Sequence, residues 1–336
     1  MNVYEIQEAF GLENLRCVER PDPEPGPGEV LVRLRAASLN YRDLLMVRGH
    51  YNPKQPLPLI PCSDGVGVVE AVGAGVERVR EGDRVATMFT QTWIGGPPDK
   101  AKLRGTLGGP LDGALAERMV LSAEGVSPVP EHLSDTEAAT LPCAALTAWS
   151  ALVTLGDVRA GDTVLALGTG GVSIFVLQFA QMLGARVIIT SSSNEKLERA
   201  KELGAWQTIN YRETPDWGKA ARKLTNGKGV DHVVEVGGAG TLEQSLGAVR
   251  IGGQVSVIGV LSGVATKLNV IPILMSNLRL QGILVGSREG FEAMSEAISM
   301  HEMRPVVDRT FPFKEATAAF EHMASGAHFG KIAIEM

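Results

Sequence analysis

Cysteine is scarce in this sequence, which has only Cys17, Cys62 and Cys143 in 336 residues. An odd and sparse set argues against a disulfide framework and favours a reducing cytoplasm. Neither Cys-x-x-Cys nor His-Glu-x-x-His occurs. A closed structural zinc site is therefore not expected.

Positive charge and long apolar runs are also lacking. The net charge is −6 and no basic stripe is present, which argues against nucleic-acid binding. The most apolar stretch, 172–189, is interrupted by Gln178, Gln181, Gly184 and Arg186, whereas a membrane-spanning helix needs about 20 mainly apolar residues. The N-terminal residues include acids and no basic segment, which argues against a signal or transit peptide. We expect a cytoplasmic protein that binds neither membrane nor nucleic acid.

Glycine, in contrast, is abundant: the chain has 39 glycines, well above the usual share of about 7%. No Gly-x-y period is present, so a collagen is excluded. The excess instead marks tight turns and places where the backbone closely approaches another group. The 44% of apolar residues can form a core, and the length predicts about two domains.

The first 125 residues are rich in expected strands and in turn residues. The stretch from Thr90 to Pro110 contains five glycines and three prolines, and its length predicts a functional or mobile loop. The pattern changes near Ser134, which forms a capping box with Glu137 and begins a helical stretch. The strands expected before this point are 30–40, 64–76, 82–89 and 113–121.

From Asp162 onward, expected strands alternate with helical segments. This alternation predicts an α/β fold with a doubly wound parallel sheet. After Gly286 the pattern gives two amphipathic helices and a last strand. The expected sheet strands are 163–168, 186–191, 206–211, 231–238, 253–260 and 278–286, and the later elements are 289–300, 314–325 and 331–336.

The motif GTGGVS (168–173) lies between an expected strand and an expected helix. Gly168 permits the tight turn, and Gly170 lets backbone N–H groups approach a pyrophosphate. The helix that begins at Gly171 points its positive end at that anion. Ser173 replaces the third glycine of the motif and is expected to loosen the helix–strand packing slightly. The alternative is an ordinary strand-to-helix turn without a ligand.

The second strand of this region ends in Ser191, Ser192 and Ser193, not in an acid. NAD-binding proteins usually carry an Asp or Glu about 20 residues after the glycines, which binds the ribose 2′-hydroxyl. Hydroxyls with Lys196 and Arg212 nearby suit a 2′-phosphate. We therefore favour NADP(H), with NAD(H) possible. In the alternative reading, Ser193 or Asn194 only caps the helix and Lys196 lies on its solvated face.

The chain resembles the medium-chain dehydrogenase/reductase superfamily, in its zinc-independent, quinone-oxidoreductase-like branch. The resemblance extends over essentially the whole chain. It rests on SLNYRDLLMVRG (38–49), DGVGVVEAVGAGV (64–76) with the GDRV that follows, GGPLDGALAE (108–117), LPCAALTAW (141–149), GTGGVS, AWQTINYRE (205–213) and the terminal GKIAI.

This resemblance implies a β-rich, GroES-like catalytic domain formed by both ends of the chain, 1–144 and 287–336. A Rossmann NAD(P)-binding domain, 145–286, is inserted between them. The resemblance also implies a homodimer or homotetramer, in which copies often pair through the edges of the nucleotide-domain sheets.

Zinc-dependent members of this superfamily hold a Cys, a His-Glu pair and a second Cys around the metal. The matching positions here are Asn40, Ser63-Asp64 and Cys143, so one ligand survives, and 90–110 contains no cysteine lobe. We therefore expect no zinc and no other metal. A site built from Cys62, Cys143 and Asp64 is the weaker reading, because two small, partly buried cysteines are more common.

The resemblance assigns cofactor contacts position by position. Hydroxyl and basic groups lie at the adenosine ribose or its phosphate, and strand ends lie at the nicotinamide, where Gly237 and Gly259 would leave room for the flat ring. Lys331 would close over the cofactor from the C-terminal segment. The contacts are Gly168, Gly170, Gly171, Val172 and Ser173 at the pyrophosphate, Ser191, Ser192, Lys196 and Tyr211 at the adenosine side, and Thr147, Val236, Gly237, Ile258, Gly259, Val260, Leu284 and Val285 at the nicotinamide.

Without zinc, another group must polarise the substrate oxygen or supply a proton. Asn40 lies at a former ligand position, and the hydroxyls of Tyr41 and Tyr51 follow on the adjoining segment. The alternative places Tyr41 in the core and packs Tyr51 against the proline-rich stretch 53–61.

Reduction of a quinone or an enone needs no metal Lewis acid. The sequence therefore favours a zinc-independent, NAD(P)H-dependent oxidoreductase that acts on a quinone or an activated conjugated carbonyl. A metal-free alcohol or aldehyde dehydrogenase is one alternative. A nucleotide-binding protein without turnover is the other.

Overall fold

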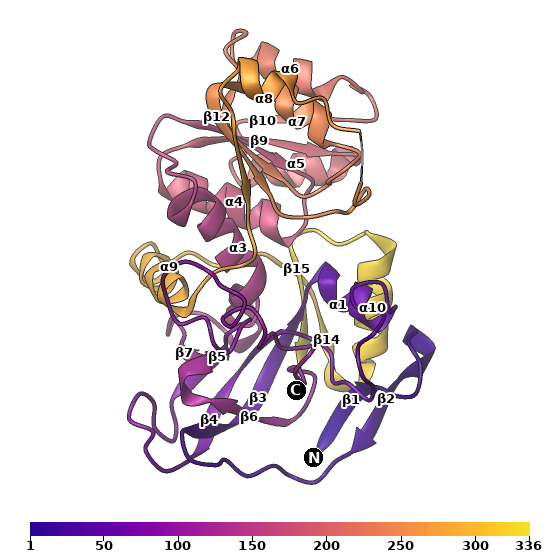
Figure 1. The fold of residues 1–336 in the computed structure, drawn as a ribbon, viewed down its shortest axis with the longest axis vertical. Helices are drawn as coiled ribbons and strands as arrows, with labels where there is room; N and C mark the ends of the chain where they lie inside the picture. Colours follow the sequence, from indigo (N-terminus) through magenta and orange to yellow (C-terminus); the bar gives the residue numbers. More distant parts are fainter. Residues whose placement is uncertain (266) are drawn as a thin grey trace. The chain divides into compact units, whose positions relative to one another are not determined.

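The computed structural model describes residues 1–265 and 267–336 (Figure 1). These residues form two compact units. The first, which we call the β-rich unit, joins Met1–Leu146 with Gly286–Met336. The second, the inserted unit, is Thr147–Val285.

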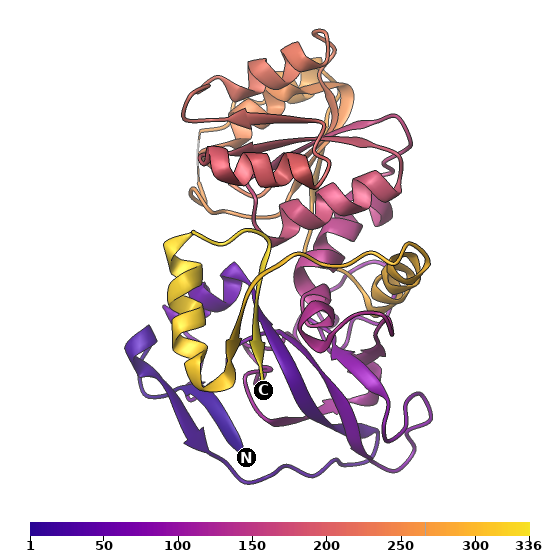
Figure 2. The ribbon, with the colours of Figure 1, turned by 180° about the vertical axis from the view of Figure 1, so that it is seen from behind.

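A seven-stranded sheet organises the β-rich unit, with the order β14-β15-β3-β4-β5-β7 and β6 paired to β3. The last strand of the chain, β15, runs antiparallel to β3, with Ile332 opposite Leu39. Figures 1 and 2 show this C-terminal strand in yellow beside the indigo β3. The strands are β3 (Glu29–Leu39), β4 (Asp64–Val72), β5 (Arg84–Thr87), β6 (Arg118–Ser122), β7 (Val126–Pro128), β14 (Val307–Pro312) and β15 (Lys331–Glu335), with a separate antiparallel pair β1 (Asn2–Ile6) and β2 (Leu15–Glu19).

Short helices complete the β-rich unit. The predicted capping box is confirmed, because the Ser134 hydroxyl accepts from the Glu137 amide and the Glu137 carboxylate accepts from the Ser134 amide. The helical stretch that follows is broken into short α and π segments, and Pro142, which lacks an amide hydrogen, lies in the first π segment. The helices are η1 (Leu12–Asn14), α1 (Tyr41–Val47), η2 (Ala123–Gly125), α2 (Asp135–Ala138), η3 (Leu141–Ala145), α9 (Arg288–Met300), η5 (Phe313–Glu315) and α10 (Ala316–Ser325), while α3 (Leu146–Trp149) and η4 (Ser150–Thr154) begin the inserted unit.

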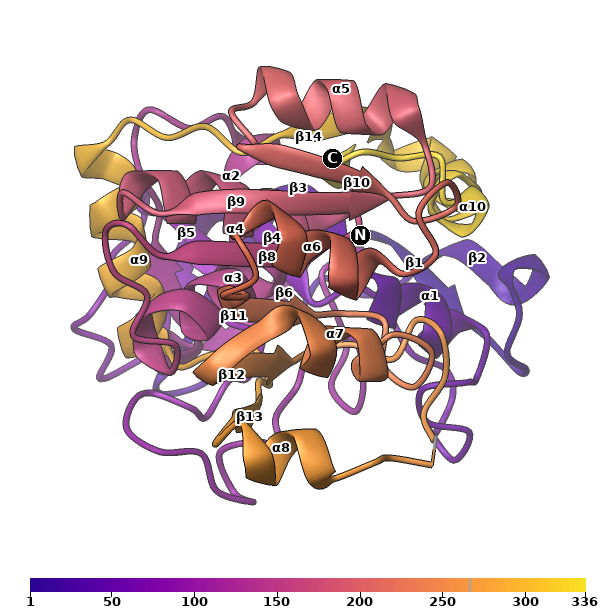
Figure 3. The same cartoon turned by 90° about the horizontal axis from the view of Figure 1, so that it is seen from above.

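The inserted unit contains a six-stranded, all-parallel sheet with the order β10-β9-β8-β11-β12-β13, seen from above in Figure 3. This is the order of a Rossmann sheet, in which strand direction of progress reverses between β8 and β11. The predicted doubly wound sheet is therefore confirmed. Its elements are β8 (Thr163–Leu167), α4 (Gly171–Met182), β9 (Arg186–Ser191), α5 (Asn194–Glu202), β10 (Gln207–Asn210), α6 (Trp217–Leu224), β11 (Val230–Glu235), α7 (Leu242–Ala248), β12 (Val249–Val257), α8 (Ile271–Met275) and β13 (Arg279–Gly282).

The central strands of this sheet are buried on both faces, which explains their nearly continuous apolar sequence. Every residue of β8 is buried, and Leu165, Val233 and Val255 belong to one core cluster. The edge at β13 differs, because Ile271, Leu274 and Met275 of the neighbouring α8 are largely exposed. The pairing of copies through such an edge stays a prediction. Within the described ranges, no helix combines the length and apolar character needed to cross a membrane.

Candidate functional site

The glycine loop after β8 forms the first part of the candidate site. Gly168 has a φ of +76°, a conformation that favours glycine. Gly170 caps α4 at an ordinary φ of −80°, and a Cβ built on it would meet no heavy atom within 4 Å. The packing of this unit therefore does not explain a glycine at 170. The open space before the helix N-terminus fits the pyrophosphate of a nicotinamide dinucleotide.

Residues 171–173 form the first turn of α4. Gly171 and Val172 are half-buried, and Ser173 is buried. The Ser173 hydroxyl donates to the backbone oxygen of Leu167 at 2.6 Å. The expectation that Ser173 loosens the helix–strand packing is wrong, because this hydrogen bond fastens α4 to the end of β8.

The ends of β9 and β10 bring the predicted adenosine-side residues together. Ser191 ends β9, and its backbone oxygen accepts from the Tyr211 amide at 3.1 Å. Ser193 caps α5, since its hydroxyl accepts from the Lys196 amide at 3.3 Å, so the capping interpretation is confirmed. Lys196 and Ser192 are half-buried on the same turn. This capping leaves the predicted phosphate contact of Lys196 untouched, because only its backbone amide is used.

Two glycines predicted to face the nicotinamide have a different explanation. A Cβ on Gly237 would lie 2.3 Å from the Thr241 hydroxyl, and a Cβ on Gly259 would lie 2.4 Å from the Val236 oxygen. These glycines are therefore required by the packing of their own loops. Their assignment to a flat ligand ring is corrected here, although the loops themselves still follow the carboxyl ends of β11 and β12.

Glu235, at the end of β11, was not singled out by the sequence. Its side chain is fully buried, and Oε1 accepts from the amides of Gly237 and Gly238 at 2.7 and 2.9 Å and from the Thr241 hydroxyl at 2.6 Å. Oε2 accepts from the Ser245 hydroxyl. One carboxylate thus fixes the whole turn between β11 and α7. A lone acid within the apolar run DHVVEVGG was the signal for it.

The remaining nicotinamide-side predictions fall on short segments. Thr147 is buried in α3, between two π-helical segments. Ile258 and Val260 follow β12, and Val260 is 48% exposed. Leu284 is exposed and Val285 is buried with a φ of +51°, a strained conformation for a β-branched residue. Such strain is typical of functional segments.

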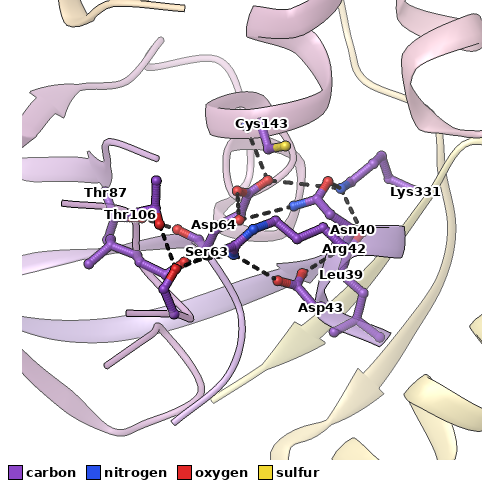
Figure 4. A network of polar contacts seen from close by, with 12 residues as sticks. Leu39, Asn40, Arg42, Asp43, Ser63, Asp64, Thr87, Thr106, Cys143 and Lys331 are labelled. Carbon is purple, nitrogen blue, oxygen red and sulfur yellow. Dashed lines mark hydrogen bonds and ion pairs between the residues drawn. The ribbon is translucent and has the colours of Figure 1, made fainter. Parts of the chain in front are cut away.

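A group of hydrogen-bonded side chains in the β-rich unit forms the second part of the site (Figure 4). We call Asn40, Ser63, Asp64, Cys143 and Lys331 the polar cluster. The Asn40 amide nitrogen donates to the Ser63 hydroxyl at 3.3 Å, and that hydroxyl donates to Asp64 Oδ1 at 2.8 Å. The Cys143 backbone amide donates to Asp64 Oδ2 at 3.3 Å.

Lys331 belongs to this cluster. Its side chain is 3% exposed, and Nζ donates to Asn40 Oδ1 at 2.6 Å and to the Leu39 backbone oxygen at 2.7 Å. Nζ also lies 3.9 Å from Asp64 Oδ2. The expectation that Lys331 closes over the cofactor is therefore corrected. The ammonium ion is buried against oxygens of its own unit.

The donors of the polar cluster do not fit a zinc ion. Burial raises the pKa of the Cys143 thiol, and the Asp64 carboxylate raises it further, so the thiolate form is disfavoured. Burial likewise raises the pKa of Cys62. Both Asp64 oxygens already accept hydrogen bonds beside a buried ammonium ion. In the described part of the chain, no group of three or more His, Cys, Asp and Glu side chains could hold a metal ion.

Tyr41 and Tyr51 are both half-exposed, at 42% and 47%. The alternative that placed Tyr41 in the core is wrong, because its ring begins α1 on the solvent side. The Tyr51 ring lies 5.0 Å from the guanidinium carbon of Arg42, a contact the sequence did not indicate. Their roles as proton donors stay predictions.

Arg42 holds the long loop 90–110 to α1. Its two terminal nitrogens donate to the backbone oxygens of Leu107 and Gly109, each at 2.7 Å. The guanidinium also stacks between the rings of Tyr51 and Phe89, at 5.0 and 4.9 Å. The end of this loop is therefore anchored. Arg42 was missed because its partners are backbone atoms about 65 residues away in the chain.

Asp43 gives the site a pH dependence. It is fully buried, and burial raises its pKa from 3.8 to about 6, although Arg42 lowers it, Asp64 raises it and Lys331 lowers it. Because the folded state then binds the proton more tightly than the unfolded state, stability falls as pH rises from about 4 to about 6. That change corresponds to about 3 kcal/mol at most. We expect Asp43→Asn, which keeps an oxygen for the Asn40 amide, to remove it.

Urea denaturation of both proteins between pH 4.5 and pH 8 measures this effect. Wild type should lose stability relative to Asp43→Asn as pH rises to about 6, and the difference should be constant above it. A difference that is independent of pH would contradict the raised pKa of Asp43.

Two family models match the chain. An alcohol dehydrogenase GroES-like domain matches residues 26–131, and a zinc-binding dehydrogenase model matches residues 171–300. The chain is 45% identical to a zinc-type alcohol dehydrogenase-like protein of Schizosaccharomyces pombe, with 98% of this chain and 97% of that protein covered. It is 33% identical to a quinone oxidoreductase of Pseudomonas aeruginosa, with 94% and 93% covered.

Solved structures are similar over the full length of the chain. A putative alcohol dehydrogenase from Sinorhizobium meliloti superposes with a TM-score of 0.93 at 43% identity, with 100% of this chain and 98% of that chain covered. A mycobacterial protein complexed with NADPH superposes with a TM-score of 0.84 at 28% identity, with both chains covered completely.

Proposed function

Because this chain belongs to the medium-chain dehydrogenase/reductase superfamily and is an oxidoreductase, we propose that it transfers hydride from NADPH to a quinone or another activated, conjugated carbonyl without zinc. The observation that carries the proposal is the polar cluster. There an amide, a hydroxyl and a buried ammonium ion occupy the region where zinc-dependent relatives keep metal ligands.

The inserted unit offers the groups that would hold the dinucleotide. Gly170 and the N-terminus of α4 would take the pyrophosphate, in the space that no protein atom fills. Ser191, Ser192 and Lys196 would meet the 2′-phosphate, at a strand end without a carboxylate. A bound nicotinamide supplies the hydride, and the protein supplies orientation and electrostatics. The similar mycobacterial structure with NADPH supports this choice of cofactor.

The β-rich unit offers donors for the substrate. Hydride addition to a quinone or enone leaves negative charge on its oxygen, which must be stabilised and then protonated. The Asn40 amide is the donor of the polar cluster that combines partial exposure, 8%, with a fixed orientation. The half-exposed hydroxyls of Tyr41 and Tyr51 are candidates for the proton.

The test is turnover by the full chain. NADPH oxidation is followed with a panel of quinones and enones, before and after dialysis against a strong chelator. The proposal predicts turnover of at least one acceptor at an unchanged rate after dialysis. Absence of turnover with cofactor demonstrably bound contradicts it, and loss of activity that zinc restores contradicts the zinc-independent part.

Two alternatives follow from the relatives and the fold. The similarity to proteins named alcohol dehydrogenase favours a metal-free alcohol or aldehyde dehydrogenase, which would reduce NADP⁺ with alcohols at alkaline pH. A binding protein without turnover would bind NADPH and reduce none of the acceptors. The same assay, run in both directions, separates the three functions.

Lys196→Ala tests the choice of cofactor. We expect the ratio of NADPH to NADH affinity to fall about tenfold or more, because a hydrogen bond between charged groups contributes about 1.5–3 kcal/mol. The matched control is Lys201→Ala, on the same helix, where the side chain pairs with Glu198. Titration of protein fluorescence with each cofactor measures both ratios, and an unchanged ratio in Lys196→Ala contradicts the phosphate assignment.

A further inference from the structure

We propose that Lys331 is a positioning residue, whose buried ammonium ion fixes the Asn40 carboxamide so that its Nδ2 is presented to the substrate oxygen. This inference rests on the proposed function. It gives the zinc-free cluster a permanent positive charge, supplied by the chain itself.

The backbone around Lys331 leaves its side chain little freedom. Its amide donates to the Val306 oxygen at 3.0 Å, and the preceding Gly330 has a φ of +80°. A Cβ on Gly330 would lie 2.5 Å from the same Val306 oxygen. The next residue, Ile332, pairs with Leu39 in the sheet. The strand register therefore places Lys331 beside Asn40, although the two are 291 residues apart in the chain.

The ammonium ion decides which way the Asn40 amide faces. It can only donate, so the atom 2.6 Å away must be the amide oxygen. The amide nitrogen is then turned toward Ser63, where one of its two hydrogens is used. A charged donor on the oxygen also polarises the amide and strengthens donation by its nitrogen. The second hydrogen of Nδ2 is the one available to a substrate.

The surrounding charges make the ammonium ion a fixed component of the cluster. The carboxylates of Asp43 and Asp64 are fully buried, and Arg42 and Lys331 are the cations beside them. Removal of Lys331 leaves Asp64 without its nearby cation. An added metal ion would be repelled by the same ammonium ion, since unlike a thiol it offers no ligand.

The central experiment is a double-mutant cycle with Lys331→Met and Asn40→Ala. We expect each single variant to lower kcat for the acceptor by between about ten- and 100-fold, with little change in NADPH affinity. We expect the double variant to lose little beyond Asn40→Ala, because Lys331 acts through Asn40. Lys331→Arg should recover part of the rate. Independent, multiplicative losses would overturn the proposal, as would a loss in Lys331→Met that only follows NADPH affinity.

Lys314→Met, at an exposed position of the same unit, is the matched control and should leave kcat unchanged. Should Lys331→Met fail to fold, Lys331→Gln replaces it in the cycle, because its amide donates to the Asn40 oxygen without charge. The expectation for the cycle is the same.

A second readout does not need turnover. In protein labelled with ¹⁵N-asparagine, the side-chain signal of Asn40, identified by its loss in Asn40→Asp, should exchange its hydrogens faster in the Lys331 variant than in wild type. Unchanged exchange overturns the proposal. If wild type reduces none of the acceptors, the proposed function fails, and this measurement still decides whether Lys331 fixes Asn40.

Discussion

Gly170→Val is expected to weaken NADPH binding by at least about 100-fold while the free energy of unfolding stays within about 0.5 kcal/mol of wild type. The free protein has room for the side chain, since no heavy atom lies within 4 Å of the Cβ position. The backbone at φ −80° and ψ −177° is extended and open to any residue. A pyrophosphate at the N-terminus of α4 would need the same space. The substitution therefore separates binding from folding.

The neighbouring glycine would not serve this purpose. Gly168 has a φ of +76°, so valine there would strain the backbone and lower stability together with binding. The matched control for Gly170 is Gly247→Val, in α7, where a Cβ likewise meets no atom within 4 Å. Calorimetric titration with NADPH and urea denaturation are measured on both variants. NADPH affinity within threefold of wild type in Gly170→Val would contradict the placement of the pyrophosphate.

The part of the fold that the sequence predicted is the part that local patterns determine. In the inserted unit, each buried strand is one apolar run and is followed by a helix, so the order from β8 to β13 could be read along the chain. The capping box at Ser134 depends on residues three apart. The glycine loop is equally local. In all three cases, the residues that decide the structure are neighbours in the sequence.

Contacts between distant residues were not predictable in the same way. Lys331 was assigned to the cofactor because no pattern in the chain shows that β15 pairs with β3. Arg42 anchors a loop through backbone oxygens, which any sequence supplies. The glycines at 237 and 259 carry the opposite lesson, since a glycine near an expected ligand can be required by its own loop.

Glu235→Ala is expected to lower the free energy of unfolding of the inserted unit by about 4 kcal/mol. The substitution leaves four buried donors without an acceptor, and each unsatisfied donor costs about 1–3 kcal/mol where the site does not relax. The turn between β11 and α7 then loses its anchor. Since Val236 and Gly237 lie in this turn, NADPH affinity should also fall in the protein that remains folded.

Glu235→Gln is the matched control, because it keeps the shape and one acceptor oxygen. That oxygen still serves Gly237, Gly238 and Thr241, while the Ser245 hydroxyl can turn to accept from the new amide. We expect a loss of about 1–2 kcal/mol, well below that of Glu235→Ala. Hydrogen exchange at the amides of β11 measures both, since it reports on the inserted unit by itself. Equal losses in the two variants would show that the negative charge, and not the acceptor geometry, fixes the turn.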